Sequence, residues 1–126
     1  MKIFVDGGCR PNPGAMEVAA VAAGRLYRLA DVGYGHSDEA EWLALLHALD
    51  VAGSLGIQDV VLIGDAADVI GQASGKSKCR SAKAQAYRAR FLSQSEAFAR
   101  VRVRHVRQGR NLAGIALQRV RANAPA

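Results

Sequence analysis

Three acidic residues lie in settings where a carboxylate can meet a metal ion or a phosphate. Asp6 ends the apolar run 3–5 and is followed by a turn rich in glycine, proline and asparagine. An aspartate there is expected at the rim of a buried strand, on a backbone flexible enough for a phosphate or a metal to approach. Asp65 closes the apolar run 60–64, and Glu41 lies in a segment with helical character. Because three separate elements carry these acids, the acids can converge on one point.

Convergent carboxylates are what the two-metal cleavage of a phosphodiester requires. In that chemistry several carboxylates hold two cations ~3.5–4 Å apart, one activating water and the other stabilising the leaving 3′ oxygen. Mg²⁺ and Mn²⁺ prefer oxygen ligands, so Asp and Glu suffice. Each acid also has a purely structural interpretation: Asp6 can initiate the glycine turn, Glu41 can be a solvated helix residue, and Asp65 can cap the helix after it.

The elements that would position these acids follow from the apolar pattern. Residues 59–65 have the continuous apolar character of a central strand buried on both faces. Ser37 is the expected N-cap of the first helix. A mixed sheet flanked by helices is the natural way to bury these elements. The predicted strands are 2–5, 17–23, 25–32, 59–65 and 100–106, and the predicted helices are 37 to 53 or 56, 66–74, 82–99 and 111–121.

The motifs, in their order, resemble those of the ribonuclease H (type 1) family. That family carries a strand with D-G, a helix with A-E-[YW]-x-A-L and a strand ending in G-D, matched here at residues 6–7, 40–45 and 64–65. The resemblance implies one α/β domain over residues 1–126, with a five-stranded mixed sheet flanked by helices. The implied activity is metal-dependent cleavage of the RNA strand of RNA–DNA hybrids. The implied catalytic ligands of a two-metal Mg²⁺ or Mn²⁺ site are Asp6, Glu41 and Asp65.

One carboxylate of the family pattern is missing. Members usually carry a fourth acid near the C-terminus, in a pattern like N-x-x-A-D-x-L-A. Counting from Asn111 without a gap puts Ile115 at the acid position, whereas matching the alanine puts Gly114 there. No Asp or Glu follows Glu96. The leading hypothesis is an active ribonuclease H-like hydrolase, and the alternative is a catalytically impaired nucleic-acid-binding module. A third is a nuclease of the same fold with another substrate, such as a DNA junction or a 3′ end.

The resemblance also implies a surface for the hybrid beside the acids. The turn after Asp6 would touch the minor groove, where 2′-hydroxyls distinguish RNA from DNA. His105 precedes Asn111 by six residues, the spacing of a catalytic His that in some bacterial members lies in a mobile loop and assists proton transfer or product release. A strand-end His on a basic face is the equal alternative. The expected nucleic-acid contacts are Gly8, Arg10, Asn12, Ser37, Arg104 and Arg107.

The charge distribution favours a polyanionic partner. The chain has 17 Lys and Arg against 11 Asp and Glu, a net charge of +6. All the acids lie at or before Glu96, while arginines crowd the C-terminal part. A one-sided basic region of this kind is typical of phosphate-backbone binding, and a solvated arginine-rich surface is the alternative.

The remaining features favour a cytoplasmic protein with no membrane partner. Half of the residues are apolar, so a packed core is expected. Cys9 and Cys79 do not have the spacing of metal ligands. The sequence predicts no signal peptide, and no stretch approaches the ~18 apolar residues of a membrane span.

Overall fold

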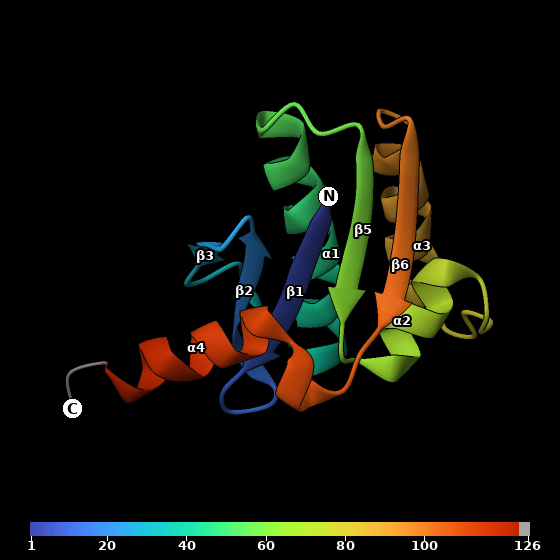
Figure 1. Ribbon diagram of the computed structural model, residues 1–126. Coiled ribbons are helices and arrows are strands. Elements are labelled where there is room, and N and C mark those ends of the chain that lie inside the picture. Colours follow the sequence, from blue (N-terminus) through green and yellow to red (C-terminus); the bar gives the residue numbers. More distant parts are fainter. Residues whose placement is uncertain (124–126) are drawn as a thin grey trace.

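A mixed β-sheet with helices on both faces is the frame of the protein (Figure 1). The computed structural model describes residues 1–123. Strands β1, β2 and β3 form an antiparallel meander, and β5 and β6 add to the other side of β1 in parallel, in the order β3-β2-β1-β5-β6. The short β4 pairs with β2 beside this path. The strands are β1 (Lys2–Cys9), β2 (Gly14–Ala22), β3 (Arg25–Leu29), β4 (Tyr34–Gly35), β5 (Asp59–Gly64) and β6 (Arg100–His105).

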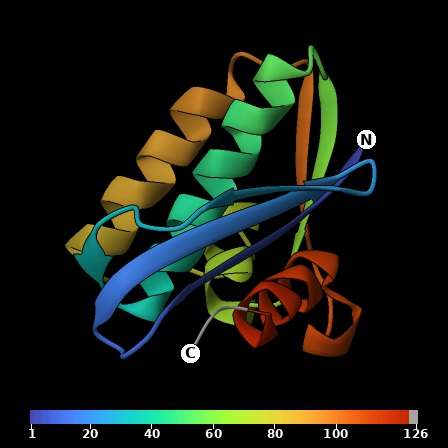
Figure 2. The same cartoon turned by 90° about the vertical axis from the view of Figure 1, so that its left-hand side faces the viewer.

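The helices form two layers, one on each face of this sheet. Helices α1, α2 and α3 share the main core with one face, whereas α4 lies alone against β1 and β2 on the other face (Figure 2). This arrangement confirms the predicted α/β class, with its five-stranded mixed sheet extended by β4. The helices are α1 (Ser37–Ser54), α2 (Ala67–Ser74), α3 (Ala82–Ser95), the short 3₁₀ helix η1 (Gln108–Arg110) and α4 (Leu112–Ala122).

The main core forms between α1 and the centre of the sheet. Alternate residues of β5, Val60 and Leu62, are fully buried among the leucines of α1. Trp42 of α1 is buried and stacks on Tyr87 of α3, with ring centroids 6.2 Å apart. This packing fixes the rotation of α1 about its axis. Because Glu41 directly precedes Trp42, it also fixes the direction in which the Glu41 side chain leaves the helix.

Several predicted boundaries are wrong for identifiable reasons. β1 continues to Cys9 because its pairing with β2 runs through Cys9 and Met16, so Asp6 lies inside a strand. The third strand ends at Leu29, after which the chain turns to form β4.

The helix ends also differ from the prediction. His36, not Ser37, is the N-cap of α1, and its N–H donates to Oε1 of Glu39 at 3.3 Å. α3 ends at Ser95, four residues before the predicted end, and Leu92 is 43% exposed. Among residues 1–123, no helix combines the length and the apolar character needed to cross a bilayer.

Gly7 allows α1 to cross β1 at close range, and this contact generates a stability prediction. A Cβ at Gly7 would lie 2.1 Å from the Ala40 carbonyl oxygen and 2.9 Å from the Glu41 nitrogen, both backbone atoms. We expect Gly7→Ala to lower the free energy of unfolding by roughly 3 kcal/mol, measured by urea denaturation, because backbone must shift to accommodate the methyl group. Gly53→Ala, in α1 with no atom within 4 Å of the added carbon, is the control and should stabilise by roughly 0.5–1 kcal/mol. Equal effects of the two substitutions would contradict the tight crossing.

Candidate metal centre and nucleic-acid interface

The three predicted acids converge in the structure. Asp6, Glu41 and Asp65 each offer a carboxylate oxygen, and these oxygens all lie within 4.8 Å of one another. The parallel pairing of β1 with β5 explains the position of two of them. Phe4 pairs with Ile63, so Asp6 and Asp65, each two positions further on, reach the same level of adjacent strands, Asp6 within β1 and Asp65 just after β5.

Glu41 reaches the same point from helix α1, which covers one face of the sheet. The crossing of α1 over Gly7 brings the first turns of the helix against the end of β1. The Gly7 N–H donates to Oε1 of Glu41 at 3.3 Å, which holds the Glu41 side chain toward Asp6. The structural alternative for Asp65 is not supported, because Ala66 is the N-cap of α2 and that helix has no side-chain cap.

Crowding of the acids changes their protonation. Burial, and then the charge of Asp65, raise the pKa of Asp6 from 3.8 to about 6, although the nearby Arg121 acts in the opposite direction. Burial, and then the charge of Asp6, raise the pKa of Glu41 from 4.5 to about 9. The metal-free cluster therefore holds protons that a divalent cation would displace. A donor set made only of carboxylate oxygens fits Mg²⁺ or Mn²⁺ rather than a softer metal.

Asn111 is a site residue that the sequence reasoning missed. Its side chain is fully buried, and its Nδ2 donates to the Val5 carbonyl at 2.8 Å and to Oδ2 of Asp65 at 3.0 Å. Its Oδ1 accepts from the Ala113 N–H at 3.1 Å, which makes it the N-cap of α4. The available signal was its place at the start of the C-terminal motif. Asn111 thus orients the Asp65 carboxylate and anchors α4 at the site.

The structure resolves which residue occupies the position of the missing acid. A Cβ at Gly114 would lie 3.6 Å from Oδ2 of Asp6 and 3.8 Å from Oδ2 of Asp65. Gly114 therefore faces the acids, as the alanine-matched alignment predicts. Ile115 is rotated by about 100° around the helix from that direction. The cluster has three carboxylates, and α4 presents a bare backbone where a fourth would project.

Four of the expected nucleic-acid contacts lie in β1, in the turn after it and at the start of α1. Nδ2 of Asn12 donates to Oγ of Ser37 at 3.1 Å, and the Ser37 N–H donates back to Oδ1 of Asn12 at 3.2 Å. This reciprocal pair ties the turn between β1 and β2 to the start of α1. Gly8 lies in β1 two residues after Asp6, and Arg10 is exposed in the turn.

The other expected contacts lie at the far side of Asp65. His105 is the last residue of β6, exposed, with Nε2 3.3 Å from the Asp65 carbonyl oxygen. It is thus a strand-end residue beside the cluster rather than a loop residue. Arg104 of β6 and Arg107, just before η1, are exposed.

The C-terminal arginines are distributed over β6, η1 and α4. Arg102 is paired with Asp59 at 3.1 Å, and Arg121 is paired with Glu17 of β2. Strand register and helix docking thus place acids from earlier in the chain against two of these arginines, and the expected basic region stays a prediction.

The comparisons with known proteins agree with this geometry. The family model described as reverse transcriptase-like matches residues 6–119. The structure of RNase H1 from the halophilic archaeon Halobacterium salinarum NRC-1 is 25% identical, with 98% of each chain covered and a TM-score of 0.84. The N-terminal RNase H domain of rv2228c from Mycobacterium tuberculosis is 26% identical, with 98% of this chain and 97% of that chain covered and a TM-score of 0.79.

A third similar structure carries a nucleic acid. It is LC11-RNase H1, isolated from compost, in complex with an RNA/DNA hybrid, with 20% identity, 88% of each chain covered and a TM-score of 0.79. At that identity the likeness shows the fold alone. The search of curated proteins finds no match.

The fold and the order of the acids define a ribonuclease H-like protein. The chain belongs to the reverse transcriptase-like family, since the family model covers most of its length. The family expected from the motifs is thus confirmed.

The raised pKa values generate a prediction for the metal-free protein. An acid with a raised folded-state pKa stabilises the fold below its unfolded pKa, and this contribution is lost as the pH rises through the folded value. For Glu41 the window runs from about 4.5 to about 9. In EDTA, Glu41→Gln should match wild type at pH 4 and exceed it at pH 8 by roughly 1–3 kcal/mol, several degrees in Tm.

The control for this measurement is Glu96→Gln, which removes the same charge from the exposed end of α3. It should show little change with pH, and saturating Mg²⁺ should reverse the advantage of Glu41→Gln because only wild type keeps the full ligand set. A Tm difference between wild type and Glu41→Gln that does not vary with pH would show that Glu41 is an ordinary solvated acid.

Proposed function

We propose that this protein is a metal-dependent endonuclease that cleaves the RNA strand of RNA–DNA hybrids. The observation that carries the proposal is the convergence of Asp6, Glu41 and Asp65 within 4.8 Å, from three elements in ribonuclease H order. The likeness to the RNase H1 of H. salinarum over 98% of both chains supports it. The hybrid bound to LC11-RNase H1 supports a hybrid as the substrate class.

In this proposal the three acids hold Mg²⁺ or Mn²⁺, with two ions expected. The ions would supply an activated water and charge stabilisation for the leaving oxygen. Asn111 acts as a positioning residue, because its Nδ2 donates to Oδ2 of Asp65 and leaves that carboxylate one orientation. His105 is exposed next to the Asp65 carbonyl, where its imidazole can contact the substrate or the attacking water.

RNA would be recognised by the turn between β1 and β2 together with the start of α1, which the Asn12–Ser37 hydrogen bonds join. The Ser37 hydroxyl accepts from Asn12, so its own proton is free to donate to a 2′-oxygen in the minor groove. Gly8, half-buried beside the Arg121 guanidinium, adds a backbone without a side chain of its own. Arg10, Arg104 and Arg107 would contact phosphates on the two sides of the acids.

The bare backbone at Gly114 favours one alternative function. Without a fourth carboxylate beside Asp6 and Asp65, the site carries less charge to hold a second cation. A nucleic-acid-binding module with weak or no catalysis is therefore the second candidate.

The assay that decides between them uses a labelled RNA–DNA hybrid, with duplex DNA, duplex RNA and single-stranded RNA as controls. Wild type should cut only the RNA of the hybrid. Asp6→Asn should lower the rate by on the order of 100-fold or more while circular dichroism stays native, because it removes a charge and a metal ligand at constant volume. If wild type cuts no hybrid in either Mg²⁺ or Mn²⁺, the binding-module interpretation replaces the nuclease.

The position of the missing acid gives a gain-of-function prediction. With three carboxylates, Mn²⁺ should activate better than Mg²⁺, since Mn²⁺ stands higher in the affinity series. Gly114→Asp should raise the cleavage rate in Mg²⁺ more than in Mn²⁺ and lower the Mg²⁺ concentration for half-maximal activity.

Ile115→Asp is the matched control, adding the same charge one residue along α4. It should give no gain, because its side chain is directed away from the acids. If Ile115→Asp raises Mg²⁺-dependent cleavage and a folded Gly114→Asp does not, then Gly114 is not the position of the missing ligand.

A further inference from the structure

A groove with cationic lining residues lies outside the acid cluster, between α2 and β6. The groove has a volume of about 540 Å³. Val61, Ile70 and Val103 contribute apolar side chains to its lining, while Ser74 and Ser77 contribute hydroxyl groups. Lys76, Arg102 and Arg104 are its cationic lining residues, and no carboxylate lines the groove among the residues that the structure describes.

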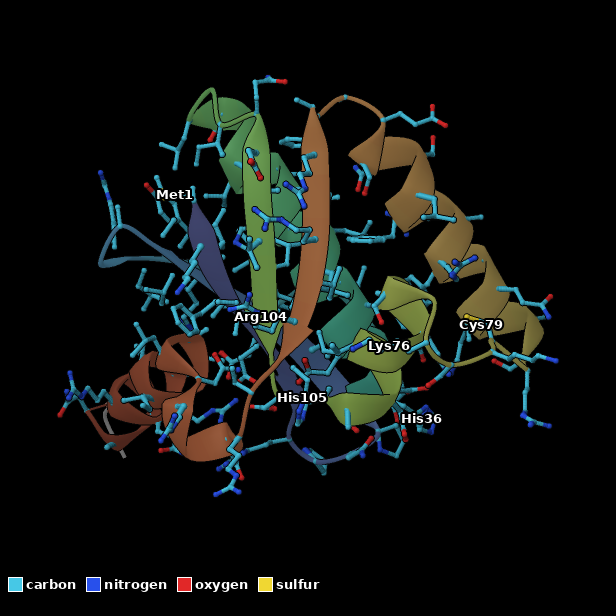
Figure 3. All side chains as sticks on the ribbon, turned by 45° about the vertical axis from the view of Figure 1, so that its right-hand side comes forward. Met1, His36, Lys76, Cys79, Arg104 and His105 are labelled. Carbon is cyan, nitrogen blue, oxygen red and sulfur yellow. The ribbon has the colours of Figure 1, made fainter. Side chains whose placement is uncertain are left out.

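The loop after α2 is folded so that it forms one wall of this groove. Gly75 has a φ of +85° and ends α2 with a left-handed turn. The chain then returns along the helix, and the Ser77 N–H donates to the Gly71 carbonyl at 3.0 Å. A Cβ at Gly71 would lie 2.6 Å from Oγ of Ser77, which shows how closely the loop returns to the helix. Lys76 thus lines the same groove as Arg104, and both residues lie near the C-terminal end of β6 (Figure 3).

The groove is continuous with the proposed catalytic site. His105 lines it and lies 3.3 Å from the Asp65 carbonyl oxygen. α2 begins two residues after Asp65, at Ala67, which also lines the groove. From His105 the groove follows β6 back to Arg102, a distance of ~10 Å along the strand. A chain leaving the acid cluster on this side therefore meets the cations in succession.

Charge complementarity identifies the class of occupant. Lys76 and Arg104 form no ion pair within residues 1–123. Arg102 is paired with Asp59, but both side chains are about half exposed, so the pair is weak and exchange for a phosphate costs little. Cations spaced along an open groove, with hydroxyl groups beside them, match a phosphate backbone.

We propose that this groove binds the phosphate backbone of a single strand that continues from the hybrid beyond the acid cluster. The inference rests on the proposed function for the identity of that strand. The groove lies between a helix and the edge strand of the sheet and so admits one strand rather than a duplex. The protein then favours hybrids that carry a single-stranded extension at one end.

The test is a binding measurement by fluorescence anisotropy in EDTA, where no metal-dependent cleavage occurs. The probes are a blunt hybrid and the same hybrid with a single-stranded DNA extension on one end or the other. One of the two extensions should tighten binding roughly tenfold at low salt and steepen the salt dependence. Lys76→Glu should abolish this gain while leaving the cleavage of blunt hybrid in Mg²⁺ unchanged.

Arg25→Glu is the matched control, because it makes the same charge change on β3, at the opposite edge of the sheet. Arg25→Glu should keep the full increase in affinity that the extension gives. Lys76→Ala, which removes the charge without reversing it, should lose part of the increase that Lys76→Glu loses completely. The proposal is overturned if neither extension tightens binding or if the gain survives in Lys76→Glu.

Two further outcomes distinguish this proposal from binding of an acidic protein segment and from the proposed nuclease function. A glutamate-rich peptide that binds wild type but not Lys76→Glu, and displaces the extension at equal charge concentration, would overturn the nucleic-acid assignment in favour of an acidic protein segment. Wild type that fails to cut blunt hybrid yet shows the Lys76-dependent gain would contradict the proposed nuclease and support the groove as a strand-binding site.

Discussion

Mutual repulsion among three carboxylates is the constraint around which this structure is arranged. Their oxygens lie within 4.8 Å of one another, and burial first, then the charge of the neighbouring acids, raise the pKa values of Asp6 and Glu41. The β1–β5 register, the crossing of α1 at Gly7 and the hydrogen bonds from Asn111 to β1 and Asp65 all hold the acids against this repulsion. The acid cluster lowers the free energy of unfolding, and the packing of α1 on the sheet offsets that loss.

Helix α4 adds no charged group to the acid cluster. Its N-cap, Asn111, donates a hydrogen bond to Asp65, and Gly114 faces the acids without a side chain. Asn111 fixes its beginning, and Arg121 pairs with Glu17 of β2 near its end, two turns beyond Gly114. The helix is therefore anchored on both sides of the position where a carboxylate is missing. Under the proposed function, this geometry predicts a site assembled for cation binding but with reduced affinity for the second ion.

The sequence was sufficient to predict the fold class and the convergence of the acids, because apolar runs that end in Asp6 and Asp65 carry strong local signals. It was insufficient where the outcome depends on tertiary contacts. A gap of one residue left Gly114 and Ile115 equivalent until the docking of α4 separated them. Likewise, the pairing of arginines with distant acids depends on strand register, and the burial of Asn111 depends on how α4 begins, which no local pattern encodes.

The most direct test of this account is a crystal structure of the protein grown with Mn²⁺, using the anomalous signal of manganese to locate the ion. We expect a peak at ~2.0–2.3 Å from carboxylate oxygens of Asp6, Glu41 and Asp65. A weaker second peak should lie on the side facing Gly114. A well-ordered structure with manganese bound elsewhere and none between these three residues would contradict the metal centre.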